Sequence, residues 1–327
     1  MVDLAKFARA SRDSLRRRWK PTTAAVAIVA LLGAGGIWWA VSAGSARVDC
    51  ATLQEEQFND ANTLAIACNA EVEVVSERTP WETSWAGPDG ITRLEVSAVP
   101  TRTKVEDEWV PVDSKLIVSD GSIETAAAVF PIELNPGGSE GASAPLATIE
   151  RDGHTIDIWF PLELPAPAID GSRAIYDFGD GIRLAVTVNV DGTGITSVVE
   201  LENAVAAQRF LELLEADRLT DGTAGTGLDI GYGTNVSEGL TLAVDEYSQT
   251  LVTDLEGETQ FYAPPPIMWD SSGETVTYDS ETTEVASTDR LAQPSAGDRS
   301  VQIDASLVDS TIVVTPDAQM LADPDTV

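Results

Sequence analysis

From residue 69 onward, apolar and polar positions along the chain tend to alternate, which is the period of a half-buried β-strand. The alternation is clear in Glu-Val-Glu-Val at 71–74 and Leu-Glu-Val-Ser at 94–97, with Pro-Asp-Gly at 88–90 as a turn between strands. Further strands are expected at 101–105, 108–118, 146–150, 155–160, 173–178, 182–190, 195–202, 228–232, 240–244, 249–253, 258–262, 301–307 and 311–315. Short strands separated by Gly and Asp turns predict a mainly β chain with one or more antiparallel β-sandwich-like domains.

Helical periodicity appears in two segments. Residues 60–68 place small apolar side chains on one face, with Asn59 or Asp60 as the candidate N-cap. Residues 204–214 predict one short helix that caps a sheet edge. Between the strands, residues 135–145 are rich in Gly, Pro and Ser and are expected to form a flexible loop.

The amino-terminal part differs from the rest in both charge and hydropathy. Residues 1–23 are basic, and residues 24–43 form an uncharged apolar run. At about 1.5 Å per residue such a run can cross a bilayer as a helix, and the positive charges before it favour export of the carboxyl-terminal side. Two interpretations stay open: a retained transmembrane anchor, or a signal peptide cleaved after Ala43 or Ala46. Both predict an extracytoplasmic protein.

The net charge of the chain limits which kinds of partner it can bind. The whole chain has a formal net charge of −33, with 53 acidic residues, and only Asp3 and Asp13 of these precede residue 48. The exported part is therefore strongly acidic, and it would repel a phosphate backbone. No nucleic-acid partner is expected, whereas the apolar run predicts contact with a membrane.

Cys50 and Cys68 are the two cysteines of the chain, and they form a candidate disulfide if the protein is exported. A continuous helix between them would separate them by roughly 27 Å, too far for a bridge. The bridge therefore requires the helix to be confined to about 60–68, with residues 50–59 folding back along it. The alternative is a pair of small buried thiols.

These patterns divide the chain into five parts. They are a basic cytoplasmic segment at 1–23, a transmembrane or signal helix at 24–43, a β-rich extracytoplasmic domain at 48–270, an acidic Ser/Thr-rich linker or insertion at 271–300, and a terminal β-hairpin at 301–327 that could begin a truncated module.

Several short motifs resemble a known family. They are the export segment with the two cysteines, residues 73–79, the Gly-Pro-Asp-Gly turn at 87–90, residues 109–113, Pro-Ala-Pro at 165–167, Tyr176 before Gly-Ile-Arg-Leu at 181–184, residues 263–273 and residues 321–326. In combination they resemble the N-terminal region of large actinobacterial exported proteins with LamG-like jelly-roll, DNRLRE or RHS-repeat modules. The resemblance implies a β-rich leader domain of a surface or secreted protein, without the downstream modules. It provides no catalytic residues that could be assigned to positions of this chain.

Few residues offer enzymatic chemistry. His154 is the single histidine and follows an Asp-Gly turn, so a zinc site or a nucleophilic triad has little to build on. Asp177 and Asp180 could form a carboxylate pair of the kind glycosidases use, but such pairs arise easily by chance in a chain this acidic. We therefore predict no catalytic residues, no cofactor-binding residues and no metal ligands. The residues 177–181 and 317–325 are weak Ca²⁺-loop candidates without EF-hand spacing.

Aromatic residues allow a binding alternative. Trp81 and Trp85 would share one face of a strand and could form a carbohydrate platform, whereas Trp109, Trp159 and Trp269 are expected in the core. The favoured interpretation is an exported non-catalytic β-sandwich module with a structural or interaction role, whose partner is a cell-surface glycan or a protein. The alternatives are a carbohydrate- or Ca²⁺-binding module and, third, a carboxylate-dependent glycoside hydrolase.

Overall fold

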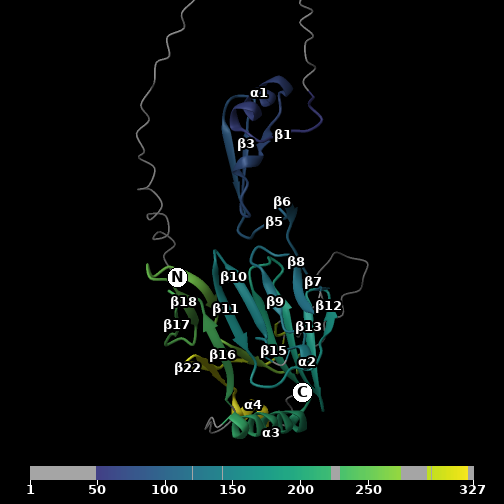
Figure 1. Cartoon of the computed structure of the whole chain (residues 1–327), viewed down its shortest axis with the longest axis vertical. Coiled ribbons are helices and arrows are strands. Elements are labelled where there is room, and N and C mark those ends of the chain that lie inside the picture. Colours follow the sequence, from purple (N-terminus) through teal and green to yellow (C-terminus); the bar gives the residue numbers. More distant parts are fainter. Residues whose placement is uncertain are drawn as a thin grey trace, which may run out of the picture. The chain divides into compact units, whose positions relative to one another are not determined.

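A computed structural model describes residues 49–119, 121–141, 143–221, 229–273, 293–295 and 297–322 of the chain (Figure 1). The predicted basic segment 1–23 and apolar helix 24–43 lie outside these residues. Within the described ranges, no helix is both long enough and apolar enough to cross a membrane. Val48–Val327 belong to one compact unit, which is mainly β as the sequence predicts.

The first part of this unit, residues 50–97, is called here the amino-terminal module. Its elements are β1 (Gln54–Glu55), α1 (Phe58–Cys68), β2 (Val72–Val74), the 3-10 turn η1 (Val75–Glu77), β3 (Glu82–Ala86) and β4 (Thr92–Val96). The strands form one sheet in the order β1-β2-β3-β4. The pair β1–β2 is parallel because α1 carries the chain back between them; every other strand pair in the described residues is antiparallel.

Helix α1 packs on this sheet through small side chains. Its buried face, Ala61, Leu64 and Ala65, contacts a cluster that includes Val72 and Val74 of β2. The helix starts earlier than predicted, at Phe58, and Gln57 occupies the N-cap without a side-chain hydrogen bond, so Asn59 and Asp60 are not the cap. The module thus has a hydrophobic core of its own.

A hairpin of β5 (Arg102–Val105) and β6 (Glu108–Pro111) follows the module. The sequence predicts one strand over 108–118, but the structure divides it: β6 pairs with β5, whereas β7 (Asp113–Ser119) joins a different sheet. The break lies at Val112, whose amide donates to the Thr101 carbonyl. Pro111 and the polar run at 113–115 interrupt the alternation at this point, and the prediction of one strand did not use them.

The remaining strands and helices, residues 113–322, are called here the main body. They are β8 (Ser122–Ala127), β9 (Ile132–Leu134), α2 (Gly138–Gly141), β10 (Ala147–Arg151), β11 (His154–Trp159), β12 (Ala168–Asp170), β13 (Arg173–Gly179), β14 (Ile182–Val188), β15 (Ile195–Leu201), α3 (Ala204–Asp221), β16 (Ile230–Val236), β17 (Thr241–Val244), β18 (Thr250–Thr253), β19 (Thr259–Ala263), β20 (Ile267–Trp269), β21 (Ser300–Gln302), β22 (Asp304–Val308), β23 (Thr311–Thr315) and α4 (Ala318–Ala322). Most predicted strands are present within a few residues. Strands β1, β8, β9, β12 and β20 are not anticipated by the sequence patterns, and β3 is anticipated only as the strand before the Pro-Asp-Gly turn.

Two sheets build most of the main body. One has eight strands in the order β22-β23-β16-β11-β10-β9-β8-β7, and the other has four in the order β12-β13-β14-β15. A single hydrophobic core takes Leu134 and Ile156 from the larger sheet and Tyr176 and Leu184 from the smaller one. This arrangement is consistent with a β-sandwich.

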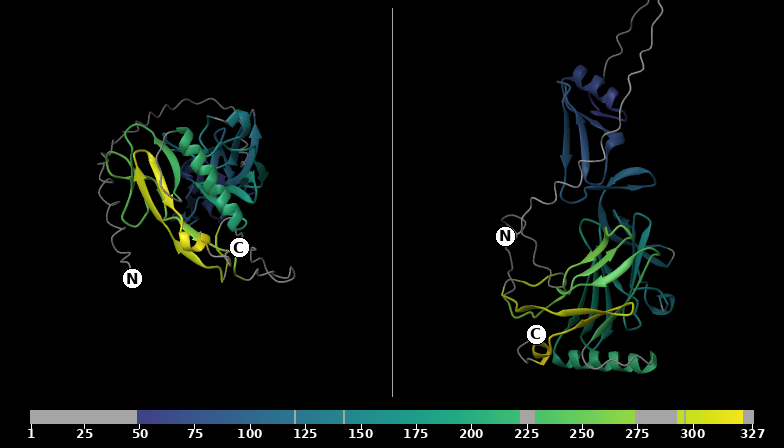
Figure 2. Two further views of the ribbon diagram at one scale, coloured as in Figure 1. Left: turned by 90° about the horizontal axis from the view of Figure 1, so that it is seen from below. Right: turned by 90° about the vertical axis from the view of Figure 1, so that its left-hand side faces the viewer.

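Helix α3 closes one end of this core (Figures 1 and 2). It runs for 18 residues instead of the predicted 11, and it buries Ala206, Phe210 and Leu214 in the core. Asn203 caps it, accepting hydrogen bonds from the amides of Val205 (2.9 Å) and Ala206 (3.1 Å). The sequence predicts a helix that caps a sheet edge, whereas in the structure this helix packs against the hydrophobic core.

The loop 135–145, expected to be flexible, is organised around one buried side chain. Asn135 Nδ2 donates to the carbonyls of Gly141 (3.1 Å), Ala144 (2.8 Å) and Pro145 (3.2 Å), and its Oδ1 accepts from the Gly137 amide at 2.7 Å. Tyr176, fully buried, donates its hydroxyl to the Asn135 carbonyl at 2.6 Å. Residues 135–141 and 143–145 of this Gly- and Pro-rich segment thus form a hydrogen-bonded turn around Asn135.

The carboxyl-terminal strands β22 and β23 form the predicted terminal hairpin. Strand β23 pairs with β16 and so belongs to the eight-stranded sheet, and β21 pairs with β20 across the segment predicted as a linker. The predicted hairpin therefore extends the eight-stranded sheet of the main body. Of the predicted linker 271–300, residues 274–292 and 296 lie outside the described part.

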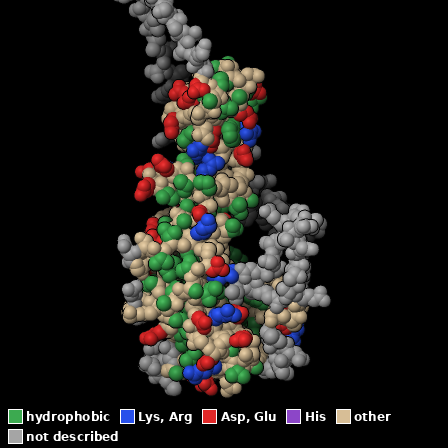
Figure 3. Space-filling view, turned by 90° about the vertical axis from the view of Figure 1, so that its right-hand side faces the viewer, with side chains coloured by type: hydrophobic (Ala, Val, Ile, Leu, Met, Phe, Trp, Pro, Cys, Tyr) green, Lys and Arg blue, Asp and Glu red, His purple; other side chains and the backbone are tan. Residues whose placement is uncertain are grey.

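The tryptophans expected in the core are only partly buried. Trp109, Trp159 and Trp269 all retain some exposure, and the Trp109 ring lies 5.2 Å from the Lys104 ammonium group. On the face seen in Figure 3, acidic side chains are scattered among apolar and basic ones and do not gather in one patch.

Candidate functional site

A large cavity of about 590 Å³ lies in the main body. Its walls come from β11, β16, β22 and β23 of the large sheet, from β15 of the small sheet, and from α3. Residues 263–271, which connect β19 to β20 and continue past β20, form a further wall, and Leu321 of α4 contributes an edge. The cavity thus joins segments that are far apart in the sequence.

Apolar side chains make up most of this wall. Ile158, Ile230 and Ile312 line it from the large sheet, Val199 from the small sheet, and Phe210 from α3. A cavity of this size and lining is typical of sites that bind small molecules with a largely apolar surface.

Asp270 is the buried charged group of the cavity wall, and its side chain has no exposed surface. Oδ1 accepts from the Ser272 hydroxyl (2.7 Å) and the Arg299 amide (2.8 Å), and Oδ2 accepts from Arg299 Nε (2.6 Å). Burial alone would raise its pKa, but the hydrogen bonds from Ser272 and Arg299 outweigh burial and hold the pKa well below its usual value. Asp270 therefore remains ionised while buried.

The same carboxylate holds two distant parts of the chain together. Asp270 follows β20 and Arg299 precedes β21, and the Asp270 amide donates to the Arg299 carbonyl at 3.0 Å. Next to them, Asp298 Oδ1 accepts from the Gly273 amide at 2.8 Å. These contacts fix the wall segment and join residue 273, the last residue described before the stretch 274–292, to residue 298.

Two further polar groups of the wall have partners in the small sheet. Tyr232 forms a hydrogen bond with Ser197; burial raises the pKa of Tyr232 to about 12, although that hydrogen bond acts in the opposite direction. Glu200 Oε2 lies 2.9 Å from Arg183 Nε across β14 and β15. Tyr232 is thus a neutral group at the wall.

Negative charge dominates the ionisable groups of this cavity. Among the described residues that line it, the charged side chains are Glu200, Glu202 and Asp270, of which two already contact an arginine. A neutral or cationic ligand fits this setting better than an anionic one.

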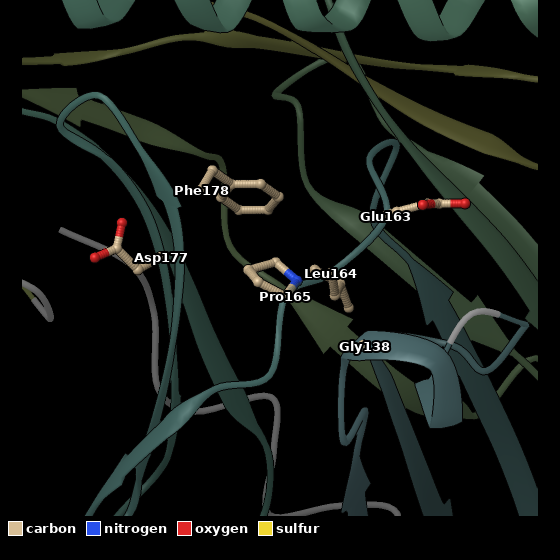
Figure 4. Close-up of a pocket in the computed structure, with 6 residues that line it drawn as sticks. All are labelled: Gly138, Glu163, Leu164, Pro165, Asp177 and Phe178. Carbon is tan, nitrogen blue, oxygen red and sulfur yellow. The ribbon is translucent and has the colours of Figure 1, made fainter.

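A second, more open pocket of about 310 Å³ lies beside the loop 135–145. Figure 4 shows Phe178, Pro165 and Leu164 forming its apolar surface, with Asp177 and Glu163 on opposite sides. The two carboxylates point away from each other. A pair of acids acting on one bond must converge on it, and these two do not.

The carboxylates singled out from the sequence, Asp177 and Asp180, have local structural partners. They flank the β13–β14 turn, where Asp177 Oδ1 accepts from the Gly179 amide at 2.8 Å and Asp180 has a positive φ of 53°. Asp180 is largely exposed and lies 3.8 Å from Arg209 Nε. The pattern Asp-Phe-Gly-Asp-Gly is explained by the turn, in which Asp and Gly tolerate this backbone conformation.

The Ca²⁺-loop candidates find no support in the described residues. No group of three or more His, Cys, Asp or Glu side chains there is arranged to hold a metal ion. Asp317 accepts from the Met320 amide at 2.7 Å in the first turn of α4, and residues 323–325 of the candidate loop lie outside the described part.

The other sequence candidates are in the amino-terminal module or at a turn. A disulfide joins Cys50 and Cys68, with the bridge at the end of α1. Arg93 lies over the Trp85 ring, with its guanidinium carbon 5.1 Å from the ring centroid, so one face of this ring is already occupied. His154 begins β11 opposite Arg151 and lines neither cavity described above.

Sequence patterns did not identify the large cavity. One signal was present, because the Pro-rich segment 263–273 is the most specific motif of the family resemblance and supplies Pro264, Met268, Trp269 and Asp270 to the wall. The remaining walls come from ordinary strand and helix positions, whose convergence no local pattern encodes. No family model, no curated protein and no solved structure matches this chain.

Proposed function

We propose that the chain is an exported, non-catalytic binding module whose large cavity takes a neutral or cationic ligand with an apolar body. The observation that carries the proposal is the cavity of about 590 Å³, lined mainly by apolar side chains from both sheets and α3. Cavities of roughly 300–1,000 Å³ with a few fixed polar groups are the usual form of small-molecule sites. The charged side chains of the lining are all carboxylates, which disfavours an anionic ligand.

Export is the part of the proposal that rests on sequence. The basic segment 1–23 and the apolar run 24–43 favour translocation of the rest of the chain, either anchored to the membrane or released after cleavage. A Cys50–Cys68 disulfide supports the same location, because disulfides persist in oxidising compartments. The motif resemblance adds the proposal that the module acts as a leader domain in an actinobacterial surface or secreted protein.

A titration with apolar dyes tests the ligand class. The full chain is solubilised in a non-fluorescent detergent, at a detergent concentration too low to compete with the protein for the dye. Binding of a neutral dye such as N-phenylnaphthylamine is then compared with binding of the anionic dye anilinonaphthalene sulfonate. Saturable binding is expected for the neutral dye, with weaker binding of the anionic one. Absence of saturable binding by the neutral dye contradicts the proposed site.

Two adjacent positions on α3 give a matched pair of variants. Ala204 lines the cavity at the start of the helix, whereas Val205 is 78% exposed and is not part of the cavity wall. Ala204→Trp is expected to weaken dye binding by partly filling the cavity, and Val205→Trp is expected to leave dye binding unchanged. Equal effects of both variants would assign the dye to a different surface.

Location is tested separately. Protease treatment of intact cells should digest the region after residue 48, and amino-terminal sequencing of the mature protein distinguishes an anchor from a cleaved signal. Protection of that region in intact cells, with digestion after lysis, refutes export without affecting the ligand-binding result.

A further inference from the structure

Strand β4 forms an edge of the amino-terminal sheet and is exposed along its whole length. All five of its residues, Thr92–Val96, are exposed, and Leu94 and Val96 retain 56% and 62% of their surface. In the described part of the chain, β4 pairs with β3 on one side and has no neighbouring strand on the other. An open edge with exposed apolar side chains is a template for pairing with another strand.

The register of the β3–β4 pair determines which backbone groups face outward. The Ser97 amide donates to the Trp81 carbonyl (2.8 Å), and the Gly87 amide donates to the Ile91 carbonyl (2.9 Å). Hydrogen-bonded and non-hydrogen-bonded pairs alternate in an antiparallel ladder, so Arg93 and Glu95 also direct their backbone groups to β3. Thr92, Leu94 and Val96 therefore direct their N–H and C=O groups to the open edge.

These outward groups allow only a few registers for antiparallel pairing with a second β4. Centring the pair on residue 93 places Arg93 opposite Arg93, and centring it on residue 95 places Glu95 opposite Glu95. Centring it on Leu94 places Leu94 opposite Leu94 and each Arg93 opposite the Glu95 of the other copy. Only this third register uses all three outward residues and opposes unlike charges, which favours it over the other two.

The side chains reinforce the same register. Arg93 and Glu95 of opposite copies would form non-hydrogen-bonded pairs, in which side chains approach most closely. Arg93 is already held near this position by Glu71, with Nε at 2.9 Å and Nη2 at 2.8 Å, while its Nη1 contacts Glu95 of the same strand at 3.2 Å. On the other face, the pairing would cover the exposed side chains of Leu94 and Val96.

We propose that two copies of this chain associate through antiparallel pairing of their β4 strands, centred on Leu94. The sequence Thr-Arg-Leu-Glu-Val is self-complementary in this register, because each charged residue meets its opposite across the two-fold axis. This inference is independent of the ligand cavity, which lies in the main body.

Sedimentation of the full chain in detergent micelles over a concentration series tests the proposal, with Arg93→Glu and Glu95→Arg as single variants. Each variant places like charges opposite each other in both symmetric contacts, so the dissociation constant is expected to rise about tenfold or more. A mixture of the two variants restores unlike charges at both contacts, and it should form a heterodimer of near wild-type affinity. Any association through the apolar segment is common to all samples.

Glu95→Arg is the decisive variant, since it leaves the Glu71 contact of Arg93 in place. Glu95→Arg also lowers the negative charge of an acidic chain, and this change alone would promote non-specific association. A loss of association in this variant therefore cannot result from the change in net charge. Glu256→Arg, at an exposed turn residue, is the control for the same change in charge. A monomeric wild type, an unchanged Glu95→Arg variant or a mixture that fails to associate would each overturn the proposal.

Discussion

Glu73 of β2 is the best-connected buried charge of the amino-terminal module. It is 5% exposed, and both its carboxylate oxygens lie 2.7 Å from nitrogens of Arg78. Arg102 Nη1 lies 3.2 Å from Oε1, and Gln54 Nε2 donates to Oε2 at 3.1 Å. Arg102 also donates to the Thr83 hydroxyl. One carboxylate thus connects β1, β2 and β5.

Glu73→Gln removes the charge but keeps the shape of the side chain. Arg78 and Arg102, whose side chains are only 15% and 20% exposed, would then lack their buried counter-charge. Breaking a buried ion pair by neutralising one partner costs about 3–5 kcal/mol. Because both arginines keep some access to water, we expect a loss of about 3 kcal/mol in local stability.

Hydrogen exchange followed by mass spectrometry measures this loss in the relevant segment. Since about 1.4 kcal/mol corresponds to a factor of ten, protection of the β2 and β3 amides should fall by about two orders of magnitude. Glu71→Gln is the matched control, because the Glu71–Arg93 pair is an exposed contact of the same chemistry and should matter little. Equal losses in the two variants, or unchanged protection in Glu73→Gln, would refute the reasoning.

The pH dependence provides a second measurement on the same residue. Hydrogen bonds from Arg78 lower the pKa of Glu73, against the opposing effect of burial, and the charges of Arg78 and Arg102 lower it further. A lowered folded-state pKa gives stability that is present above the unfolded value of 4.5 and is lost as the pH falls through the folded value. Protection in the wild type should therefore decrease in this acidic range, and the decrease should be smaller in Glu73→Gln.

Three further predictions concern the disulfide and the two buried polar centres of the main body. Replacing both Cys50 and Cys68 by Ala removes a cross-link between residues 18 positions apart. Chain entropy predicts that the free energy of unfolding in urea falls by about 3 kcal/mol. An unchanged urea midpoint would show that the bridge does not restrict the unfolded chain. Tyr176→Phe removes a buried hydroxyl that donates to the Asn135 carbonyl, and it should lower the free energy of unfolding by about 1–2 kcal/mol. Asn135→Ala should lower it more, because three carbonyls and one amide lose their partner. Calorimetry that ranks the two variants in the opposite order would contradict the role given to Asn135. Asp270→Asn should reduce amide protection in β20 and β21 above about pH 4, where the carboxylate contributes because its folded pKa is lowered, and should have less effect in more acidic buffer; equal effects at all pH values would assign the loss to packing.

Local sequence patterns determine much of the strand content of this protein. A period of two specifies which side chains of a strand share a face, and Asp-Gly or Pro-Asp-Gly specifies where the chain turns, so the hairpins β3–β4, β10–β11 and β13–β14 follow from neighbouring residues. The spacing of small apolar residues likewise predicts α1, and the requirement that Cys50 and Cys68 meet predicts a helix confined near 60–68. In the structure α1 is Phe58–Cys68 and the cysteines are joined.

Only the tertiary structure decides which strands that are distant in sequence become neighbours. Backbone hydrogen bonds are chemically alike in every strand, so alternation does not specify that β16 lies between β11 and β23, or that β21 returns to β20. For the same reason the sequence predicts a terminal hairpin at 301–327 but does not specify that β22 and β23 extend the eight-stranded sheet. The cavity depends on these long-range pairings, because its walls exist only when β11, β15, β16, β23 and α3 meet. The sequence determines which side chains are available to line the cavity, but only the folded chain brings those side chains together.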